Sequence, residues 1–272
     1  MPGAATAASD LYQEEDGAGE PLVLVHGSWS GTFTWSLAMP GLAGALRVIA
    51  YDRRGHGQSP APPPGPLARR RHEDDLAALI ESAAGGRAHV AGNSYGGSIA
   101  LGLASRRPEL FRSVSAHEPP LVGIAARDPI VERAAKDLET VGEIVDHGDA
   151  EAGARHFVEN VAIGPGAWPM LPPEIHRAMV RNAPAFAAEL RDPDWADADL
   201  DALAGLTMPI LLTQGNASLP WFAPIVETLA RAAPQAELAT IDGAGHVPHQ
   251  THPGEYAAIV SSFALDSKGT ER

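Results

Sequence analysis

The chain has 272 residues and a formal net charge of −14, and it contains no cysteine. This length suits one sizeable α/β domain with room for an inserted lid. The acidic balance disfavours nucleic acid and anionic membrane surfaces as partners. Without cysteine the chain has no disulfide, no thiolate metal site and no cysteine nucleophile. The N-terminus lacks the features of a signal peptide, and no apolar run approaches the roughly 18 residues of a membrane span, so we expect a cytoplasmic protein.

Short apolar segments alternate with helical segments along most of the chain. Segments with the character of buried strands cover residues 21–27, 46–52, 87–93, 112–118, 208–215 and 236–242. Segments that predict helices cover residues 72–83, 95–107, 221–233 and 253–265. The first of these helices places Leu76, Leu79 and Ile80 at helical spacing. The alternation predicts a mostly parallel sheet with helices on both of its faces.

The alternation stops between about Pro119 and Leu206, where the sequence shows no convincing strand. Helical stretches and a proline-rich break fill this interval, which is too long for a simple connection between two strands. We therefore expect a core domain formed by residues 1–119 and 207–272. Residues 120–206 would form a helical cap, or lid, inserted between two strands of the sheet.

The sequence GNSYG at residues 92–96 lies where a predicted strand meets a predicted helix. It fits the G-x-S-x-G nucleophile elbow, a sharp turn that holds its serine in a strained conformation and exposes the hydroxyl. Glycine on either side avoids a clash. The helix that follows directs free N–H groups toward the serine, which favours a developing anion. Ser94 is therefore the candidate nucleophile; an ordinary turn between a strand and a helix is the alternative.

Four motifs resemble the α/β-hydrolase family in their order along the chain. They are LVLVHGSW (22–29), YDRRGHGQS (51–59), GNSYGG (92–97) and GAGHVPHQTHP (243–253). The resemblance extends from about residue 10 to residue 265. It implies an α/β-hydrolase sheet, mostly parallel and flanked by helices, with a helical cap after the sixth strand. It also implies that the backbone N–H groups of Ser28 and Tyr95 form an oxyanion hole, and that His26 and Arg53 are structural.

The last of these motifs contains three histidines. In the family the catalytic base follows a G-x-G sequence, and GAGH at residues 243–246 matches it, so the resemblance implies that His246 is the base. His249 and His252 are then residues of the loop. A zinc site built from the three histidines is the alternative, but their spacing in a proline-rich loop gives it weak support.

The acid is the point at which this sequence departs from the family pattern. Most members carry aspartate three residues after the glycine that ends PILLTQG, and here that position is Ser218. A neutral serine cannot stabilise an imidazolium as a carboxylate does. The other position used in the family, as in zearalenone lactonases and some haloalkane dehalogenases, is the end of the preceding strand. That position holds Glu118, which we predict to be the acid; a structural glutamate under the cap is the alternative.

The resemblance implies a serine hydrolase that cleaves a carboxylic ester or lactone through a Ser-His-Glu triad and an acyl-enzyme, with no cofactor and no metal. The expected partner is a small apolar ester or lactone, and a homodimer is left open. Four aromatic residues could line an apolar pocket between sheet and cap: Trp29, Trp168, Trp221 and Phe222. A meta-cleavage C–C hydrolase, a cofactor-free perhydrolase and a hydrolase-like small-molecule receptor are the alternatives. Serine at position 94 argues against the dehalogenases and epoxide hydrolases of the family, which use aspartate.

Overall fold

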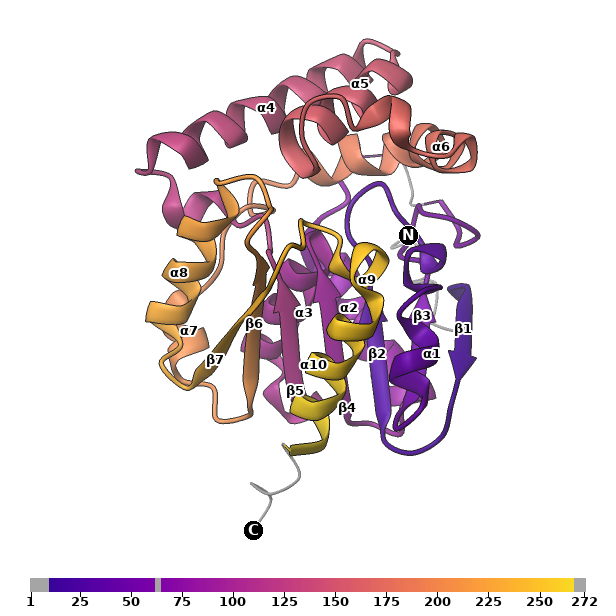
Figure 1. The fold of residues 1–272 in the computed structure, drawn as a ribbon, viewed down its shortest axis with the longest axis vertical. Helices are drawn as coiled ribbons and strands as arrows, with labels where there is room; N and C mark the ends of the chain where they lie inside the picture. Colours follow the sequence, from indigo (N-terminus) through magenta and orange to yellow (C-terminus); the bar gives the residue numbers. More distant parts are fainter. Residues whose placement is uncertain (1–9, 62–64, 267–272) are drawn as a thin grey trace, which may run out of the picture.

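The computed structural model describes residues 10–61 and 65–266, and its centre is one seven-stranded sheet. In space the strands follow the order β1-β3-β2-β4-β5-β6-β7, and only β1 is antiparallel to its neighbour (Figure 1). The strands are β1 (Gln13–Asp16), β2 (Pro21–Val25), β3 (Arg47–Tyr51), β4 (Ala88–Asn93), β5 (Phe111–His117), β6 (Ile210–Gly215) and β7 (Ala236–Ile241). Because six strands run in parallel, their carboxyl ends meet at one edge of the sheet.

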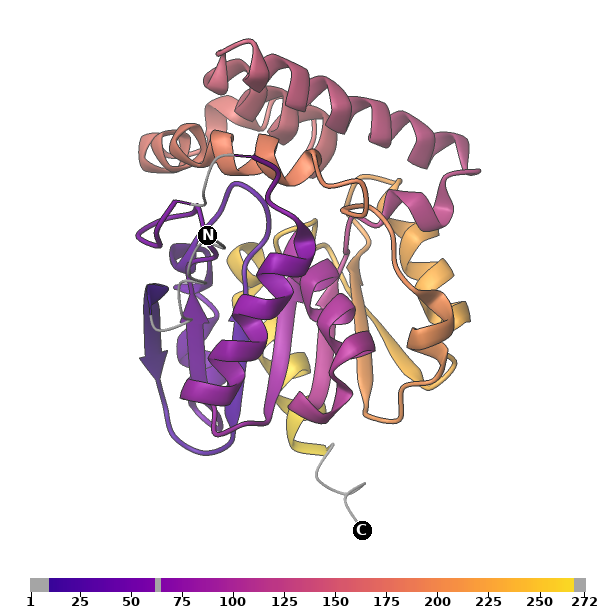
Figure 2. The same ribbon diagram turned by 180° about the vertical axis from the view of Figure 1, so that it is seen from behind.

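Alternating side chains of the central strands supply two separate cores. Val23 and Val25 of β2 pack into one apolar cluster, whereas Leu22 and Leu24 pack into the other on the opposite face of the sheet. This double burial explains why the strand reads as a continuous apolar run. Helices α1 (Met39–Ala43) and α10 (Pro253–Asp266) cover one face, and α2 (Arg69–Ala83) and α3 (Tyr95–Arg106) cover the other (Figure 2).

The segment between β5 and β6 consists of helices joined by loops and contains no strand. Helices α4 (Pro129–Asp146), α5 (Ala150–His156) and α6 (Pro173–Leu190) lie above the carboxyl ends of the strands, with a π-helical turn at Phe157–Ala162 (Figures 1 and 2). Helix α7 (Leu200–Ala204) returns to the side of the sheet and contacts α3 and α8 (Phe222–Ala232). The remaining short helices are α9 (Pro248–Thr251) and the 3₁₀ segments Thr32–Trp35, Pro108–Leu110, Val122–Ala125 and Trp168–Met170.

Two details of the sheet differ from the expectations. The helical segment follows the fifth strand of the described residues, not the sixth that the resemblance implies, because one strand fewer precedes it. Strand β1 has the sequence QEED and was not predicted, since it lies at the edge of the sheet with polar, largely exposed side chains. None of the helices in the described residues is long and apolar enough to cross a membrane.

Candidate active site

The nucleophile elbow lies between β4 and α3. Ser94 has φ 55° and ψ −128°, which places it in a strained region of backbone conformation. A Cβ atom at Gly92 would lie 2.3 Å from the carbonyl oxygen of Gly96, and one at Gly96 would lie 2.0 Å from that of Val25. Both glycines are therefore required by the turn. The elbow points Ser94 at the edge of the sheet where the other parallel strands also end.

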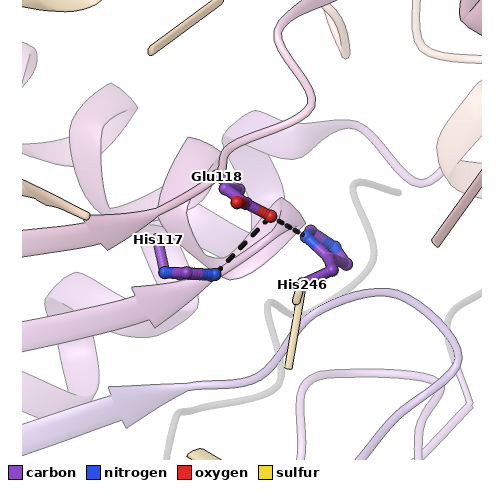
Figure 3. Close-up of side chains that lie close together, drawn as sticks. All are labelled: His117, Glu118 and His246. Atoms are coloured by element: carbon purple, nitrogen blue, oxygen red, sulfur yellow. Dashed lines mark hydrogen bonds and ion pairs between the residues drawn. The ribbon is translucent and has the colours of Figure 1, made fainter. Parts of the chain in front are cut away.

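Glu118 and His246 meet at this edge (Figure 3). Glu118 directly follows β5, and its Oε2 lies 2.8 Å from His246 Nδ1. Its other oxygen, Oε1, accepts hydrogen bonds from the Gly215 N–H at 2.8 Å and the Ser218 hydroxyl at 2.6 Å. His117 Nε2 lies 3.5 Å from Glu118 Oε2. An ionised carboxylate only accepts hydrogen bonds, so His246 Nδ1 carries the proton and its Nε2 is left as an acceptor.

Burial and hydrogen bonding determine the protonation states of Glu118 and His246. Burial alone would raise the pKa of Glu118, but the nearby His117 ring and the hydrogen bond from His246 outweigh it and hold that pKa well below its usual range. Burial lowers the pKa of His246, and the Glu118 carboxylate only partly opposes this. Near neutral pH the carboxylate is therefore ionised and the imidazole is neutral. This is the protonation state that a general base requires.

Two contacts that the sequence motifs do not predict hold His246 in place. The Asn93 side-chain amide donates a hydrogen bond to the His246 carbonyl oxygen at 2.9 Å, so the residue before Ser94 anchors the histidine loop. Phe222 stacks on the imidazole with 4.1 Å between ring centroids, and Trp221 stacks on Phe222 in turn at 3.7 Å. The middle positions of a G-x-S-x-G sequence vary, so the motif gives no signal for the role of Asn93.

Two cavities meet beside Ser94, Ser28 and His246. The larger has a volume of about 340 Å³, and its lining is mostly apolar and includes Trp29. The smaller has a volume of about 20 Å³ and is lined by Tyr95, Phe157, Phe186, Glu189, Trp221 and Phe222, among others. Three of the four predicted pocket aromatics thus border the site. The fourth, Trp168, lines neither cavity, because its indole is buried against His176 with 3.9 Å between ring centroids.

Ser28 and Tyr95 lie where two N–H groups could face an oxyanion. Tyr95 is the first residue of α3, so its N–H has no acceptor within the helix. The loop that carries Ser28 packs closely on the elbow, because a Cβ atom at Gly27 would lie 2.9 Å from the Cβ atom of Ser94. Both residues line the smaller cavity together with Ser94. Trp29, Ser94 and Glu118 are the non-glycine residues with positive φ in the described part of the chain, and all three border this site.

Arg53 and His26 fix the loop that carries Ser28. The Arg53 guanidinium donates hydrogen bonds to the carbonyl oxygens of His26 and Gly27, each at 3.0 Å. The Arg53 backbone N–H donates to His26 Nε2 at 2.9 Å, so the other ring nitrogen carries the proton and donates to the Gly27 carbonyl at 2.8 Å. Burial lowers the pKa of His26 well below its usual value, which keeps this ring neutral.

The other histidines of the last loop have hydrogen-bond partners outside the triad. His249 Nε2 lies 2.7 Å from the Thr34 hydroxyl, and His252 Nδ1 lies 3.0 Å from the hydroxyl of Thr251. Among the described residues, the group whose spacing could hold a metal ion is His117, Glu118 and His246, with ligand atoms within 4.8 Å of one another. A metal there would displace the hydrogen bond between His246 and Glu118. The arrangement is therefore better suited to proton transfer than to metal binding.

This fold, with a serine at the elbow and a histidine at the same sheet edge, defines a hydrolase of the α/β class. The sequence matches the model of the alpha/beta hydrolase family over residues 22–259, so the chain belongs to that family.

Several relatives are similar to this chain. The 2-hydroxymuconate semialdehyde hydrolase of Pseudomonas sp. (strain CF600) is 41% identical over 101 residues, which is 36% of each chain. The match therefore spans only about a third of that relative. The pimeloyl-[acyl-carrier protein] methyl ester esterase of Aromatoleum aromaticum is 30% identical over 264 residues, covering 88% of this chain and 96% of the relative. The solved structure of Est816, an N-acyl homoserine lactone degrading enzyme, has a TM-score of 0.74 at 25% identity and covers 93% of this chain and 96% of that one.

Proposed function

We propose that the protein is a serine hydrolase of carboxylic esters or lactones that uses Ser94, His246 and Glu118 as its triad. The hydrogen bond of 2.8 Å between Glu118 and His246 Nδ1 carries this proposal, because it leaves His246 Nε2 available to Ser94. The similarity to a methyl ester esterase over most of the chain supports the ester, and the similarity to a lactone-degrading enzyme supports the lactone.

The reaction begins with attack of the Ser94 oxygen on the substrate carbonyl, while His246 Nε2 takes the hydroxyl proton. Glu118 stabilises the imidazolium that forms, and the N–H groups of Ser28 and Tyr95 bind the oxyanion. Collapse breaks the bond to the alcohol, which leaves with the proton from His246, and the acyl group stays on Ser94. Water then attacks the acyl-enzyme and gives a proton to His246. The second collapse returns that proton to Ser94 and releases the carboxylic acid.

The two cavities favour an unsymmetrical substrate. The larger cavity of about 340 Å³ would hold an apolar substituent of the size that small-molecule sites accept. The smaller cavity would take a short group on the other side of the carbonyl. Phe157 lines both cavities and Phe186 lines the smaller one. Within residues 120–206, helices α4, α5 and α6 would therefore act as a cap over the core of residues 1–119 and 207–272, whereas α7 packs beside the sheet, and the cap would set the substrate range.

Cleavage of a C–C bond in a meta-cleavage product is the second candidate function. The observation in its favour is the similarity of 101 residues to a 2-hydroxymuconate semialdehyde hydrolase. The same triad could act on such a diketone, so geometry alone does not separate the two reactions.

A substrate panel tests the proposal. Hexyl acetate, ethyl octanoate, a medium-chain γ-lactone and a meta-cleavage diketone would each be incubated with the wild type and with Ser94→Ala. We expect multiple turnovers of an ester or lactone, and a loss of several orders of magnitude in the folded Ser94→Ala variant. Turnover of the diketone alone would favour C–C hydrolysis. A single burst followed by a stalled acyl-enzyme on every substrate would favour a receptor.

A further inference from the structure

A groove beside α4 shares two residues with the smaller cavity next to Ser94. The groove has a volume of about 550 Å³ and is lined by α4, by the end of α6 and by the segment that follows α6. Among the described residues, Leu190 and Trp195 line both the groove and the smaller cavity. The smaller cavity has a volume of about 20 Å³, which holds a group of about the size of a water molecule. A very small space and a much larger one therefore meet at these two residues.

Leu190 is the last residue of α6, and its side chain reaches α4. A Cβ atom at Gly142 of α4 would lie 3.0 Å from Leu190 Cδ1. Gly142 lines the groove but not the smaller cavity, so this end of the leucine side chain lies on the groove side. Leu190 also packs against the apolar cluster that contains Tyr95 and Phe186. Its side chain therefore contacts both the core and the helix that borders the groove.

The segment that carries Trp195 is anchored to the start of α2. The Arg69 backbone N–H donates a hydrogen bond to Asp192 Oδ2 at 2.6 Å, and the Arg69 guanidinium donates one to the Trp195 carbonyl oxygen at 3.4 Å. The same guanidinium donates to the Asp197 carbonyl oxygen. The Trp195 side chain packs against the apolar core. Because the backbone is held on both sides of Trp195, the indole is a fixed part of the boundary between the two spaces.

We infer that Leu190 and Trp195 form a wall that limits the length of the substituent in the smaller cavity. With the wall in place, this substituent ends after about one or two non-hydrogen atoms, because the cavity has no further room. Without either side chain, the cavity would open into the groove and the substituent could extend toward solvent. This inference rests on the proposed ester or lactone hydrolysis and names the residues that set the size of one half of the substrate.

The charge of the groove distinguishes a substituent that passes the wall. Four exposed carboxylates and one guanidinium line the groove: Glu132, Glu139, Glu143, Asp146 and Arg191. A positively charged end that reaches the groove would be attracted to it, and a negatively charged end would be repelled. Salt would weaken both effects, because these charges face solvent. A substituent that stays within the smaller cavity is too short to reach them.

Esters with and without a short end test the wall in the wild type. Ethyl hexanoate and hexyl acetate each have one short end, on opposite sides of the ester bond. Two pairs have none: 6-(trimethylammonio)hexyl and 6-sulfohexyl hexanoate, and the mirrored hexyl 7-(trimethylammonio)heptanoate and hexyl 7-sulfoheptanoate. Each value of kcat/KM is divided by the rate constant for alkaline hydrolysis of that ester. We expect the better short ester to exceed all four long esters by about tenfold or more, because extra methylene groups do not fit a closed cavity.

Three alanine variants separate an open wall from a larger cavity. Leu190→Ala and Trp195→Ala each remove a side chain of the wall, and we expect one trimethylammonio ester to come within about threefold of the better short ester. We expect this ester to exceed its sulfo partner by about threefold or more at low salt, and by less at about 0.5 M salt. Leu138→Ala is the control, because Leu138 lines the smaller cavity but not the groove, and the substitution removes the same atoms as Leu190→Ala. We expect Leu138→Ala to leave all four long esters poor substrates.

A binding measurement keeps this inference distinct from the proposed function. Calorimetry compares the Kd values of the trimethylammonio esters in Ser94→Ala and in the double variant Ser94→Ala/Leu190→Ala, without turnover. If the wild type hydrolyses no ester but the double variant binds one of these esters about tenfold more tightly than Ser94→Ala does, the proposed function fails and the wall stands. Equal Kd values in the two proteins would overturn the inference.

The kinetic results can also overturn the inference. Equal kcat/KM for short and long esters in the wild type would do so, whether or not the wall variants fold. Folded Leu190→Ala and Trp195→Ala proteins in which the long esters stay poor would do so too, as would equal acceptance of the long esters by Leu138→Ala. Long esters that a wall variant accepts without any preference for the cationic end would show that they do not enter the groove, which also contradicts the inference.

Discussion

Replacement of Glu118 by glutamine should inactivate the enzyme through the tautomer of His246. The Oε1 position is held by two donors, the Gly215 N–H and the Ser218 hydroxyl. The backbone N–H can only donate, so the amide oxygen of Glu118→Gln must take this position. The amide NH₂ group then faces His246 Nδ1, which has to accept its hydrogen bond. The imidazole proton moves to Nε2, where it blocks acceptance of the Ser94 proton.

The expected loss combines this tautomer change with the loss of a buried negative charge. An Asp→Asn change at the equivalent place of a serine protease lowers kcat by about 10⁴, which corresponds to about 5.5 kcal/mol. We expect a loss of this order in Glu118→Gln, because Glu118 is fully buried and solvent cannot replace its charge. Ser218→Ala removes one of the donors to Oε1 but keeps the carboxylate, so we expect it to stay within about tenfold of the wild type.

The assay is kcat/KM for the best ester of the panel, with the melting temperature as the check on folding. Nitrogen NMR of the His246 ring reports the tautomer directly, and we expect the proton on Nδ1 in the wild type and on Nε2 in Glu118→Gln. A folded Glu118→Gln protein with kcat/KM within tenfold of the wild type would refute the role of Glu118. Full inactivation with the wild-type tautomer would refute the reasoning about the amide.

Three further expectations concern the histidines and their support. Burial lowers the pKa of His246, so the acid limb of the profile of kcat/KM against pH should have its midpoint below about 6.5; a higher midpoint would contradict this. Burial also lowers the pKa of His26 and His249, and that of His56 to about 3. Between these values and about 6.5 the unfolded chain therefore binds more protons than the folded chain. In urea denaturation the free energy of unfolding should decrease as the pH is lowered through this window, by up to about 1.4 kcal/mol per pH unit for each histidine; a flat profile would be inconsistent with neutral buried rings. Asn93→Ala removes the hydrogen bond to the His246 carbonyl and should cost about 1 kcal/mol in kcat/KM, whereas His249→Gln should remain active. An inactive His249→Gln beside an unaffected Asn93→Ala would contradict the assignment of His246 as the base.

The sequence predicts those parts of the site that depend on short motifs and on the ends of parallel strands. Ser94 has a local signature, because the elbow requires glycine at two fixed positions. Glu118 could be predicted because Ser218 occupies the usual place of the acid and a glutamate directly follows the neighbouring strand. The structure brings Glu118 and His246 together at the sheet edge, and their catalytic roles remain predictions until the variants are measured.

Other parts of the site depend on contacts that no local pattern encodes. Glu189 reaches Arg53 across 136 residues, and its sequence context is that of an ordinary amphipathic helix. Trp168 has the composition of a pocket residue, but it stacks on His176 eight residues later and lines neither cavity. Strand β1 was missed because an exposed edge strand needs no apolar alternation. In each case the burial and the partner are set by the packing of distant segments.

The position of the acid has a consequence for how sites of this kind can diverge. β5 and β6 are neighbours in the sheet, and the Ser218 hydroxyl lies 2.6 Å from Glu118. A carboxylate at either position would therefore lie close to the same imidazole, and two substitutions exchange one arrangement for the other. An ancestor with both carboxylates would hold two like charges in contact, so one of them would have to stay protonated. An ancestor with neither would lack a counter-charge for the imidazolium. A route through the protonated pair would keep a carboxylate at every step. In this chain the Ser218 hydroxyl donates a hydrogen bond to Glu118.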